Sequence, residues 1–375
     1  MKNSIITPLL CTLLCFACSN TEKMKELHVD LEKTLSVDSL NDFLEMEKLV
    51  HIPCDQTFIS NFDKVISGKD GFFVLDKTQQ AVFKIDTHNR SIEKIIHSVG
   101  KAKNEYIKIT DIAMDNQHNI YVFDNSSRKI NIHDSEGNYM HSIEVVCGTS
   151  IAVSDEGQIA INCNRLEKDL IVIFSSSGKE LYRIKNSLET PDFVLENPGG
   201  ITAWGKEFIY SAPFDYTVYQ TEKGKNTPVA VLSFGEKQFD AANLKGVDYR
   251  GFQETLFQNA DKIMTFQQLG KYKDFIFLST DLGHQLMIDM KKNSVTNLSE
   301  TESPYNRLFS SPLCVGKDGQ FCCVISSSAI GTKFLEKLNG KDSKLPKLQT
   351  VYEKEDIEDE EEESFWMLTG QIREI

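Results

Sequence analysis

The sequence lacks the short motifs that mark several well-known catalytic sites. It contains no Gly-x-Ser-x-Gly nucleophile elbow, no phosphate-binding P-loop, no His-Glu-x-x-His helix and no dinucleotide-binding fingerprint. Its eight histidines fall mostly in expected turns or outside the expected inner strands, and no two take the same place in the repeating unit of the chain. The sequence therefore nominates no catalytic residue and no metal ligand, and we expect no bound cofactor.

Beyond residue 18 the sequence also has no Cys-x-x-Cys pair of the kind that holds structural zinc. Neighbouring Cys322 and Cys323 would point to opposite faces of a strand. The spacing of the cysteines is irregular, and the chain is far larger than the small scaffolds that depend on disulfides. We therefore expect buried free thiols at the six remaining positions, which are Cys54, Cys147, Cys163, Cys314, Cys322 and Cys323.

Positive charge is scarce. The chain has 41 Lys and Arg against 55 Asp and Glu, for a formal net charge of −14 at pH 7. No cluster of Lys and Arg with interleaved aromatics stands out, and an acidic surface repels phosphate backbones. We therefore expect no nucleic-acid partner, and a basic or neutral partner is easier to accommodate.

The N-terminus has the features of a targeting segment. Lys2 precedes an apolar run over residues 5–16 that is too short to span a bilayer as a mature helix. The following Cys15-Phe16-Ala17-Cys18 resembles the lipobox of bacterial lipoproteins, although Cys15 stands where leucine is usual. This resemblance predicts a signal peptide over residues 1–17 and a lipid on Cys18, which makes the membrane a partner through the anchor. The alternative is an ordinary secretory peptide in which Cys18 is incidental.

A repeat dominates the rest of the chain. Residues 70–76 and 118–124 show the same pattern 48 residues apart: a turn, a short strand of aromatic and β-branched residues, and a final aspartate. A second strand follows in each copy, over residues 81–86 and 129–134. Periods of roughly 40 to 50 residues are typical of propeller blades.

Further copies begin near residues 151, 207, 274 and 317, which makes six in all. The sequence therefore predicts an all-β, six-bladed propeller with four-stranded antiparallel blades over residues 48–375. Such a ring must be closed by pairing the chain ends, and residues 49–52 and 365–368 are the candidate strands. We expect a polar tether over residues 18–47 and a partly helical insertion at about 239–269, where period-two alternation is missing.

The stretch between the first two copies carries a family resemblance. Residues 100–106 read GKAKNEY, which resembles the Gly-x-Gly-Pro-x-Glu-Tyr stretch of six-bladed propeller lipoproteins of gut Bacteroidetes, themselves similar to NHL-repeat propellers. Gly100, Glu105 and Tyr106 match, whereas Ala102 and Lys103 depart from the pattern. The resemblance covers most of the chain after about residue 45. It implies the propeller fold and an outer membrane lipoprotein that faces the periplasm or the cell surface, and it implies no particular activity.

We favour the hypothesis of a binding or scaffold module of the cell envelope, with a glycan, peptide or protein partner. The candidate binding residues are Glu105, Tyr106, Asp111 and Trp204. The two aromatics suit sugar stacking or protein contacts, and the alternative is that they pack between blades. Asp111 lies just before an expected inner strand, so it can face the central channel.

The second hypothesis is a metal-dependent hydrolase or lyase, similar to the lactonases found among NHL-like propellers. Such an enzyme needs several histidines or carboxylates that converge on the central channel from different blades. Asp111 alone does not make such a site, and the 55 acidic residues offer no identifiable catalytic pair.

Overall fold

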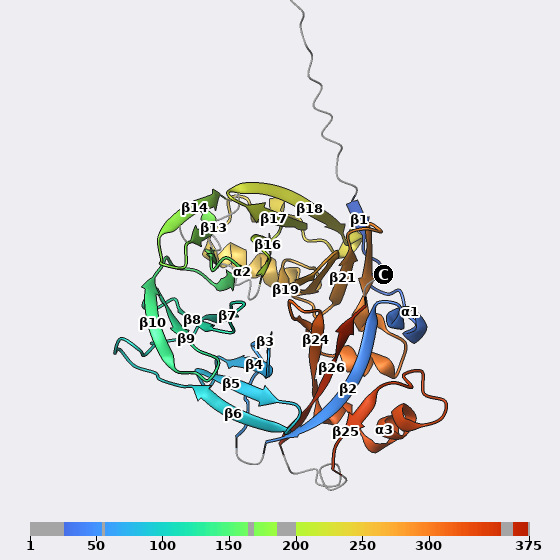
Figure 1. Cartoon of the computed structure of the whole chain (residues 1–375). Coiled ribbons are helices and arrows are strands. Elements are labelled where there is room, and N and C mark those ends of the chain that lie inside the picture. The colour runs from blue at the N-terminus through green and yellow to red at the C-terminus, as the bar shows by residue number, and fades with distance from the viewer. Residues whose placement is uncertain (1–25, 55–56, 164–168, 186–199, 354–362, 374–375) are drawn as a thin grey trace, which may run out of the picture.

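The structure is a computed structural model that describes residues 26–54, 57–163, 169–185, 200–353 and 363–373. Six sheets are arranged around a central axis (Figure 1). Each sheet forms one blade of four antiparallel strands, and two of the sheets carry a fifth, parallel strand at the outer edge. The predicted six-bladed propeller with four-stranded antiparallel blades is therefore confirmed.

The strands of the first three blades follow one another in chain order from the axis outward. Blade 1 contains β3 (Lys64–Gly68), β4 (Gly71–Asp76), β5 (Ala81–Asp86) and β6 (Ser91–Ile96). Blade 2 contains β7 (Asp111–Met114), β8 (Ile120–Asp124), β9 (Lys129–His133) and β10 (Tyr139–Glu144). Blade 3 contains β11 (Ser150–Val153), β12 (Ile159–Asn162), β13 (Asp169–Phe174) and β14 (Glu180–Lys185).

The other three blades have the same order from the axis outward, except that blades 4 and 6 also take in strands from elsewhere in the chain. Blade 4 contains β15 (Ile201–Trp204), β16 (Glu207–Ser211), β17 (Thr217–Glu222), β18 (Lys225–Ser233) and the parallel β1 (Glu26–His28). Blade 5 contains β19 (Phe266–Tyr272), β20 (Phe275–Thr280), β21 (Gln285–Asp289) and β22 (Ser294–Asn297). Blade 6 contains β23 (Cys314–Val315), β24 (Gln320–Ser326), β26 (Ser364–Ile372), β2 (Leu44–Pro53) and the parallel β25 (Gln349–Val351).

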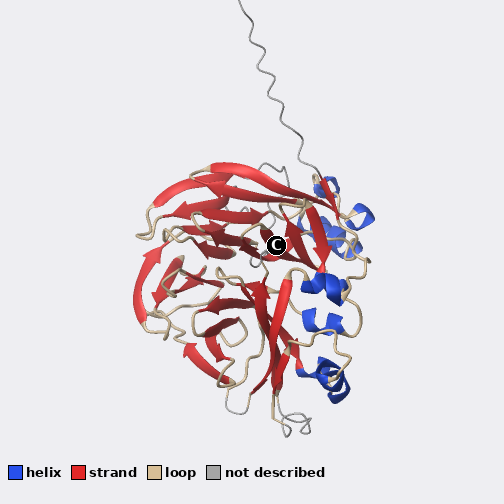
Figure 2. Ribbon diagram, turned by 45° about the vertical axis from the view of Figure 1, so that its right-hand side comes forward, coloured by secondary structure: helices blue, strands red, loops and turns tan. Residues whose placement is uncertain are grey.

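The helical elements lie along one side of the ring (Figure 2). The α-helices are α1 (Val37–Asn41), α2 (Tyr249–Gln258) and α3 (Thr332–Asn339). The 3₁₀ turns are η1 (Gly235–Lys237), η2 (Ala241–Leu244), η3 (Leu298–Glu300), η4 (Tyr305–Phe309) and η5 (Ser327–Ala329). None of the helices in the described ranges has the length and hydropathy needed to cross a membrane.

The strands of the repeat are apolar on both faces because each blade packs against two neighbours. In β4, Phe72 and Val74 belong to an apolar cluster shared with blade 6, whereas Phe73 and Leu75 belong to the cluster shared with blade 2. The described residues form one such cluster between each pair of neighbouring blades. This double burial explains why the repeat shows short continuous apolar runs in place of strict alternation.

The aspartate that ends each of the two clearest copies has a structural role. Asp76 and Asp124 are fully buried. The Oδ2 atom of Asp76 accepts a hydrogen bond from the backbone N–H of Ser60 at 2.6 Å, and that of Asp124 accepts one from Ile107 at 2.7 Å. Buried carboxylates require such donors, and both donors come from the chain that enters each blade.

The two chain ends close the ring at blade 6. Strand β2 pairs antiparallel with β26 in a register that places Leu49 opposite Leu368 and Ile52 opposite Phe365. These are the two segments predicted to close the ring, so that prediction is confirmed. In Figure 1 the early strand β2 and the late strand β26 lie side by side in the same sheet.

The expected polar tether over residues 18–47 is wrong for its described part, which begins at residue 26. Strand β1 adds to the edge of β18, and β2 already begins at Leu44. In α1, Val37 and Leu40 are fully buried. The scattered apolar residues of this polar segment each fill a place on the propeller, so the propeller begins earlier than the predicted residue 48.

The insertion expected at about 239–269 contains η2 and α2. The predicted C-terminal boundary of this insertion is wrong, because β19 begins at Phe266. Phe252 of α2 packs with Phe214, Phe239 and Leu244 over blade 4, whereas residues from Phe266 onward belong to the innermost strand of blade 5. The register of β19 shifts between residues 267 and 270, which breaks the period-two pattern there. Helix α3 and strand β25 were not predicted.

The six cysteines of the described residues form no disulfide with one another. The expectation that all six are buried is wrong for Cys54, Cys147 and Cys314, which are half-buried, and right for Cys163, Cys322 and Cys323. Cys322 packs in the cluster shared with blade 1, and Cys323 packs in the cluster shared with blade 5. Their side chains therefore lie on opposite faces of β24, as predicted. Burial raises the pKa of both thiols.

Candidate functional site

Tyr106, one of the predicted binding residues, is fully buried. Its ring packs between blades 1 and 2, and its hydroxyl donates a 2.6 Å hydrogen bond to the backbone oxygen of Gln80. Burial raises the pKa of Tyr106 above its usual value. The prediction of a ligand contact is therefore wrong, and the alternative, packing between blades, is correct for this residue.

Glu105 fastens the loop in which it lies. Its Oε2 atom accepts a 2.7 Å hydrogen bond from the backbone N–H of Ala102, and its backbone oxygen accepts one from Nζ of Lys129 at 2.5 Å. A Cβ atom at Gly100 would lie 2.0 Å from that Oε2 atom, so a larger residue would displace the carboxylate. The matching Gly, Glu and Tyr of the predicted family motif thus hold a loop together.

Trp204 lies at the end of β15, on the innermost strand of blade 4. Its ring meets that of Tyr272 edge-on, with centroids 5.7 Å apart, and packs against the cluster between blades 5 and 6. Trp204 is half-buried and does not line the cavity of the central channel. The four predicted residues are therefore not brought together in one site.

Asp111 is the candidate that lies at the channel. It is the first residue of β7, and its side chain is 5% exposed. Its Oδ2 atom lies 2.8 Å from Nζ of Lys64 and accepts a 2.8 Å hydrogen bond from the backbone N–H of Ile151. These three residues belong to blades 1, 2 and 3, so the ion pair joins the inner strands of three successive blades.

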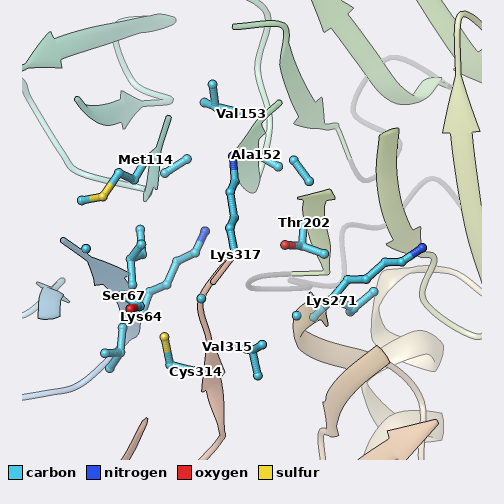
Figure 3. Close-up of a pocket in the computed structure, with 18 of the residues that line it drawn as sticks. Lys64, Ser67, Met114, Ala152, Val153, Thr202, Lys271, Cys314, Val315 and Lys317 are labelled. Carbon is cyan, nitrogen blue, oxygen red and sulfur yellow. The ribbon is translucent and has the colours of Figure 1, made fainter. Parts of the chain in front are cut away.

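One cavity of about 480 Å³ is lined by residues of all six innermost strands, and it therefore lies in the central channel (Figure 3). This volume is within the range of small-molecule sites, about 300 to 1,000 Å³. The wall is mostly aliphatic, with contributions from Val65, Met114, Ala152, Leu269 and Val315. No Phe, Tyr or Trp is among the described residues that line it.

The lining also contains polar residues, among them four lysines, two aspartates and His118. Lys64 lines it at the beginning of β3, and Lys317 lines it from the turn between β23 and β24. Nζ of Lys317 lies 2.5 Å from Oδ1 of Asp155, in the turn between β11 and β12 of blade 3. Neither lysine was singled out from the sequence, because no local pattern shows which blade supplies its partner.

Lys271 also lines the cavity, but its side chain extends away from those of Lys64 and Lys317 (Figure 3). Its Nζ donates a 3.4 Å hydrogen bond to Oε1 of Gln220 in blade 4. Burial lowers the pKa of Lys271, and the carboxylates of Glu207 and Asp274 partly oppose this shift.

The metal-dependent hypothesis requires a set of ligands that the cavity does not provide. Within the described ranges, no group of three or more His, Cys, Asp or Glu side chains is placed to hold a metal ion. His118, Asp115 and Asp318 line the cavity, but they do not form the convergent set of ligands that this hypothesis expects.

Comparisons with known proteins agree with the fold. No curated protein matches the chain. A putative exported protein from Bacteroides fragilis is 14% identical over 93% of this chain and 99% of its own, with a TM-score of 0.65. A member of the DUF4221 family from Bacteroides vulgatus is 11% identical over 88% of this chain and 98% of its own, with a TM-score of 0.52.

Both of these proteins come from Bacteroides, so the expected resemblance to propellers of Bacteroidetes is confirmed. A family model described as a domain of unknown function, DUF4934, matches residues 54–361. Because this match spans most of the chain, the protein belongs to the DUF4934 family.

Proposed function

We propose that this chain is a ligand-binding module of the bacterial cell envelope and that its site is the central cavity. The observation that carries the proposal is the cavity itself, which measures about 480 Å³ and is lined from all six blades by aliphatic side chains together with charged groups, four of them lysines. Binding sites for small ligands combine a concave apolar wall with a small number of placed polar groups.

The wall of the cavity favours an aliphatic ligand, such as a peptide segment, over a glycan. Sugar recognition in protein sites relies on aromatic faces, and the described lining residues include none. Aliphatic ligands gain affinity from burial at about 25 cal/mol per Å² of apolar surface. A glycan or protein partner at the outer faces of the blades is a separate hypothesis that the cavity does not support.

The proposed location is the outer membrane, with a lipid on Cys18 as the anchor. Cys18 lies outside the described residues, and the support comes from the apolar run over residues 5–16 and the lipobox resemblance. The eight residue-to-residue steps from Cys18 to Glu26 reach at most about 29 Å. Because the body begins with β1 at Glu26, this anchor would hold the propeller close to the membrane, facing either the periplasm or the cell surface.

The test of the cavity is a substitution that fills it. Thr202 is half-buried on β15 and lines the cavity, whereas Thr227 is exposed on the outer strand β18. Thermal unfolding is measured with short aliphatic peptides, aliphatic acids and oligosaccharides, since a ligand that binds the native state raises the melting temperature. We expect Thr202→Trp to abolish the rise and Thr227→Trp to retain it; an equal rise in the two variants would refute the cavity as the site.

A further inference from the structure

The mouth of the cavity is bridged by one ion pair. Lys317 belongs to blade 6 and Asp155 to blade 3, which are opposite one another in a ring of six. The 2.5 Å contact between Nζ of Lys317 and Oδ1 of Asp155 therefore extends across the channel. Both residues lie in the turns that follow the innermost strands of their blades.

The backbone at both ends of this bridge is held in place. The backbone N–H of Asp155 donates a 2.8 Å hydrogen bond to the backbone oxygen of Gly205 in blade 4. The backbone oxygen of Asp155 accepts a 3.3 Å hydrogen bond from Nδ2 of Asn116 in blade 2. The turn that carries Lys317 is closed by the hydrogen bond from Gly319 to Gly316 at 3.1 Å. Opening the mouth therefore requires movement of two side chains and no change in the blades.

The bridge is a weak ion pair. The side chain of Lys317 is 36% exposed and that of Asp155 is 40% exposed. Ion pairs with this exposure contribute little because water and salt screen them. By contrast, the Lys64–Asp111 pair is 18% and 5% exposed and is also held by Ile151, so it is a fixed part of the channel.

The two ammonium groups lie at different levels of the channel. Nζ of Lys64 lies 3.5 Å from the backbone oxygen of Ile151. Nζ of Lys317 contacts the carboxylate of Asp155, which is four residues further along the same segment of the chain. At about 3.3 Å per residue these levels are separated by up to about 13 Å. Between them lie aliphatic side chains, among them Ala152 and Val153.

Other charged groups at the mouth are committed to turns or are cationic. Asp115 accepts hydrogen bonds from the backbone of Gln117 and Asn119, and Asp318 accepts one from the backbone of Gln320. The other lysines of the lining near this end are Lys69, in the turn between β3 and β4, and Lys271, near the end of β19. His118, in the turn between β7 and β8, also lines the cavity. The Asp155 carboxylate is thus the anion that neutralises Lys317.

We propose that the ligand of the cavity is an aliphatic carboxylate and that its carboxylate group replaces that of Asp155 on Lys317. The proposal rests on the proposed function of the cavity and adds the chemical class of the ligand. The aliphatic chain occupies the apolar wall, while the ammonium of Lys317 exchanges one carboxylate partner for another. The displaced carboxylate of Asp155, whose side chain is 40% exposed, is then hydrated by solvent. Free fatty acids and the C-terminus of a peptide ending in aliphatic residues both have this chemistry.

The test compares sodium octanoate with 1-octanol, which has the same chain length and no charge, by titration calorimetry of the full body of the protein. Asp155→Asn removes the competing carboxylate, and we expect it to strengthen octanoate binding about two- to fivefold, the range that corresponds to losing an exposed ion pair. Octanol binding stays unchanged. Lys317→Met should weaken octanoate until it binds no better than octanol.

Matched control variants come from two exposed ion pairs. In blade 5, Nζ of Lys291 lies 3.0 Å from Oδ2 of Asp274. Lys291→Met makes the same chemical change as Lys317→Met outside the cavity lining and should alter neither the affinity for octanoate nor that for octanol. Asp261→Asn, which removes the exposed carboxylate that lies 3.4 Å from Nζ of Lys237, is the matching control for Asp155→Asn and should likewise alter neither affinity. A peptide with an aliphatic C-terminus, with its carboxylate free or amidated, identifies the source: binding of the free peptide alone indicates a peptide ligand, and binding of octanoate alone indicates a fatty acid.

The outcomes separate the two proposals. Equal strengthening of octanoate and octanol by Asp155→Asn would overturn carboxylate recognition and leave the cavity as a binding site for apolar ligands. Absence of binding of octanoate, octanol and both peptides to the wild type and to Asp155→Asn would overturn the proposed function of the cavity.

Discussion

Replacing Asp111 by alanine should destabilise the propeller by about 3 kcal/mol. The Asp111 side chain is 5% exposed. Its Oδ2 atom lies 2.8 Å from Nζ of Lys64 and accepts a 2.8 Å hydrogen bond from the backbone N–H of Ile151. Breaking a buried ion pair by removing one partner costs about 3 to 5 kcal/mol. We place the expected value at the lower end because the Lys64 side chain keeps 18% of its surface exposed and can extend its ammonium into the cavity.

The cost should come mainly from the lysine that is left without its partner. The double variant Lys64→Met/Asp111→Ala removes both charges, so its destabilisation should fall short of the sum of the two single variants by more than about 1 kcal/mol. This difference separates the ion pair from the effect of simply removing a side chain from β7.

Urea unfolding measures both quantities, with the fluorescence of the two tryptophans, Trp204 and Trp366, as the signal. With an m-value of about 3 kcal/mol per molar, 3 kcal/mol corresponds to a fall of about 1 M in the midpoint. The control is Asp274→Ala, because the side chains of the Lys291–Asp274 pair are 68% and 47% exposed and such pairs contribute at most about 1 kcal/mol. If Asp111→Ala lowers the midpoint no further than Asp274→Ala, the assigned role of the channel ion pair is refuted.

Three further predictions concern pH, ring closure and location. Burial lowers the pKa of His133 in the folded protein, so as pH falls below about 6.5 this imidazole is protonated in the unfolded state before it is protonated in the folded state. The free energy of unfolding should therefore decrease between pH 7 and pH 5, and His133→Gln should make that decrease smaller. A Cβ at Gly370 would lie 2.1 Å from the backbone oxygen of Glu45 on the facing strand, so Gly370→Ala should lower stability by about 2 kcal/mol in urea unfolding. Cys18→Ala should abolish labelling with radioactive palmitate and move the protein out of the detergent phase.

Each of these predictions has a contradicting result. If His133→Gln has the same pH dependence of unfolding free energy as the wild type, the loss of stability at low pH comes from other titratable groups. Gly331→Ser is the control for Gly370, because a Cβ at Gly331 meets nothing within 4 Å and serine suits the position before α3; equal effects of the two substitutions would refute the steric argument. Palmitate labelling that survives Cys18→Ala would favour the ordinary secretory peptide.

The fold was predictable because each blade is a local unit with the same chemical pattern. The Phe72–Leu75 run is apolar on both faces, and Asp76 ends it with hydrogen bonds to the incoming chain. The terminal aspartate is shared by the first two blades alone, but the short apolar strand recurs in every blade, so the blades could be counted. The closing strands were also predictable, since a ring with both ends in one chain must pair them.

The prediction of the tether failed because its apolar residues are isolated. Val37 and Leu40 bury themselves against blades 5 and 6, and a polar segment with scattered apolar residues gives no sign of the surface that receives them. At β19, the shift of register removed the alternation by which a strand is recognised.

Tyr106 was mispredicted as a binding residue for a related reason. Gly100, Glu105 and Tyr106 form a distinctive local pattern, and a distinctive pattern in a loop suggests a ligand site. In the structure the pattern is explained by a carboxylate that holds the loop backbone and a tyrosine that fills the space between two blades.

The sequence by itself determined the number of blades, because each blade follows from a pattern within about 50 residues. It also determined the segments that close the ring, because a ring must pair the two ends of its chain. Only the tertiary structure decided the site. Lys317 and Asp155 are 162 residues apart, and they meet because closure of a ring of six blades places blade 3 opposite blade 6. The side chains that face the channel come from six separate strands, and their convergence depends on the geometry of the ring.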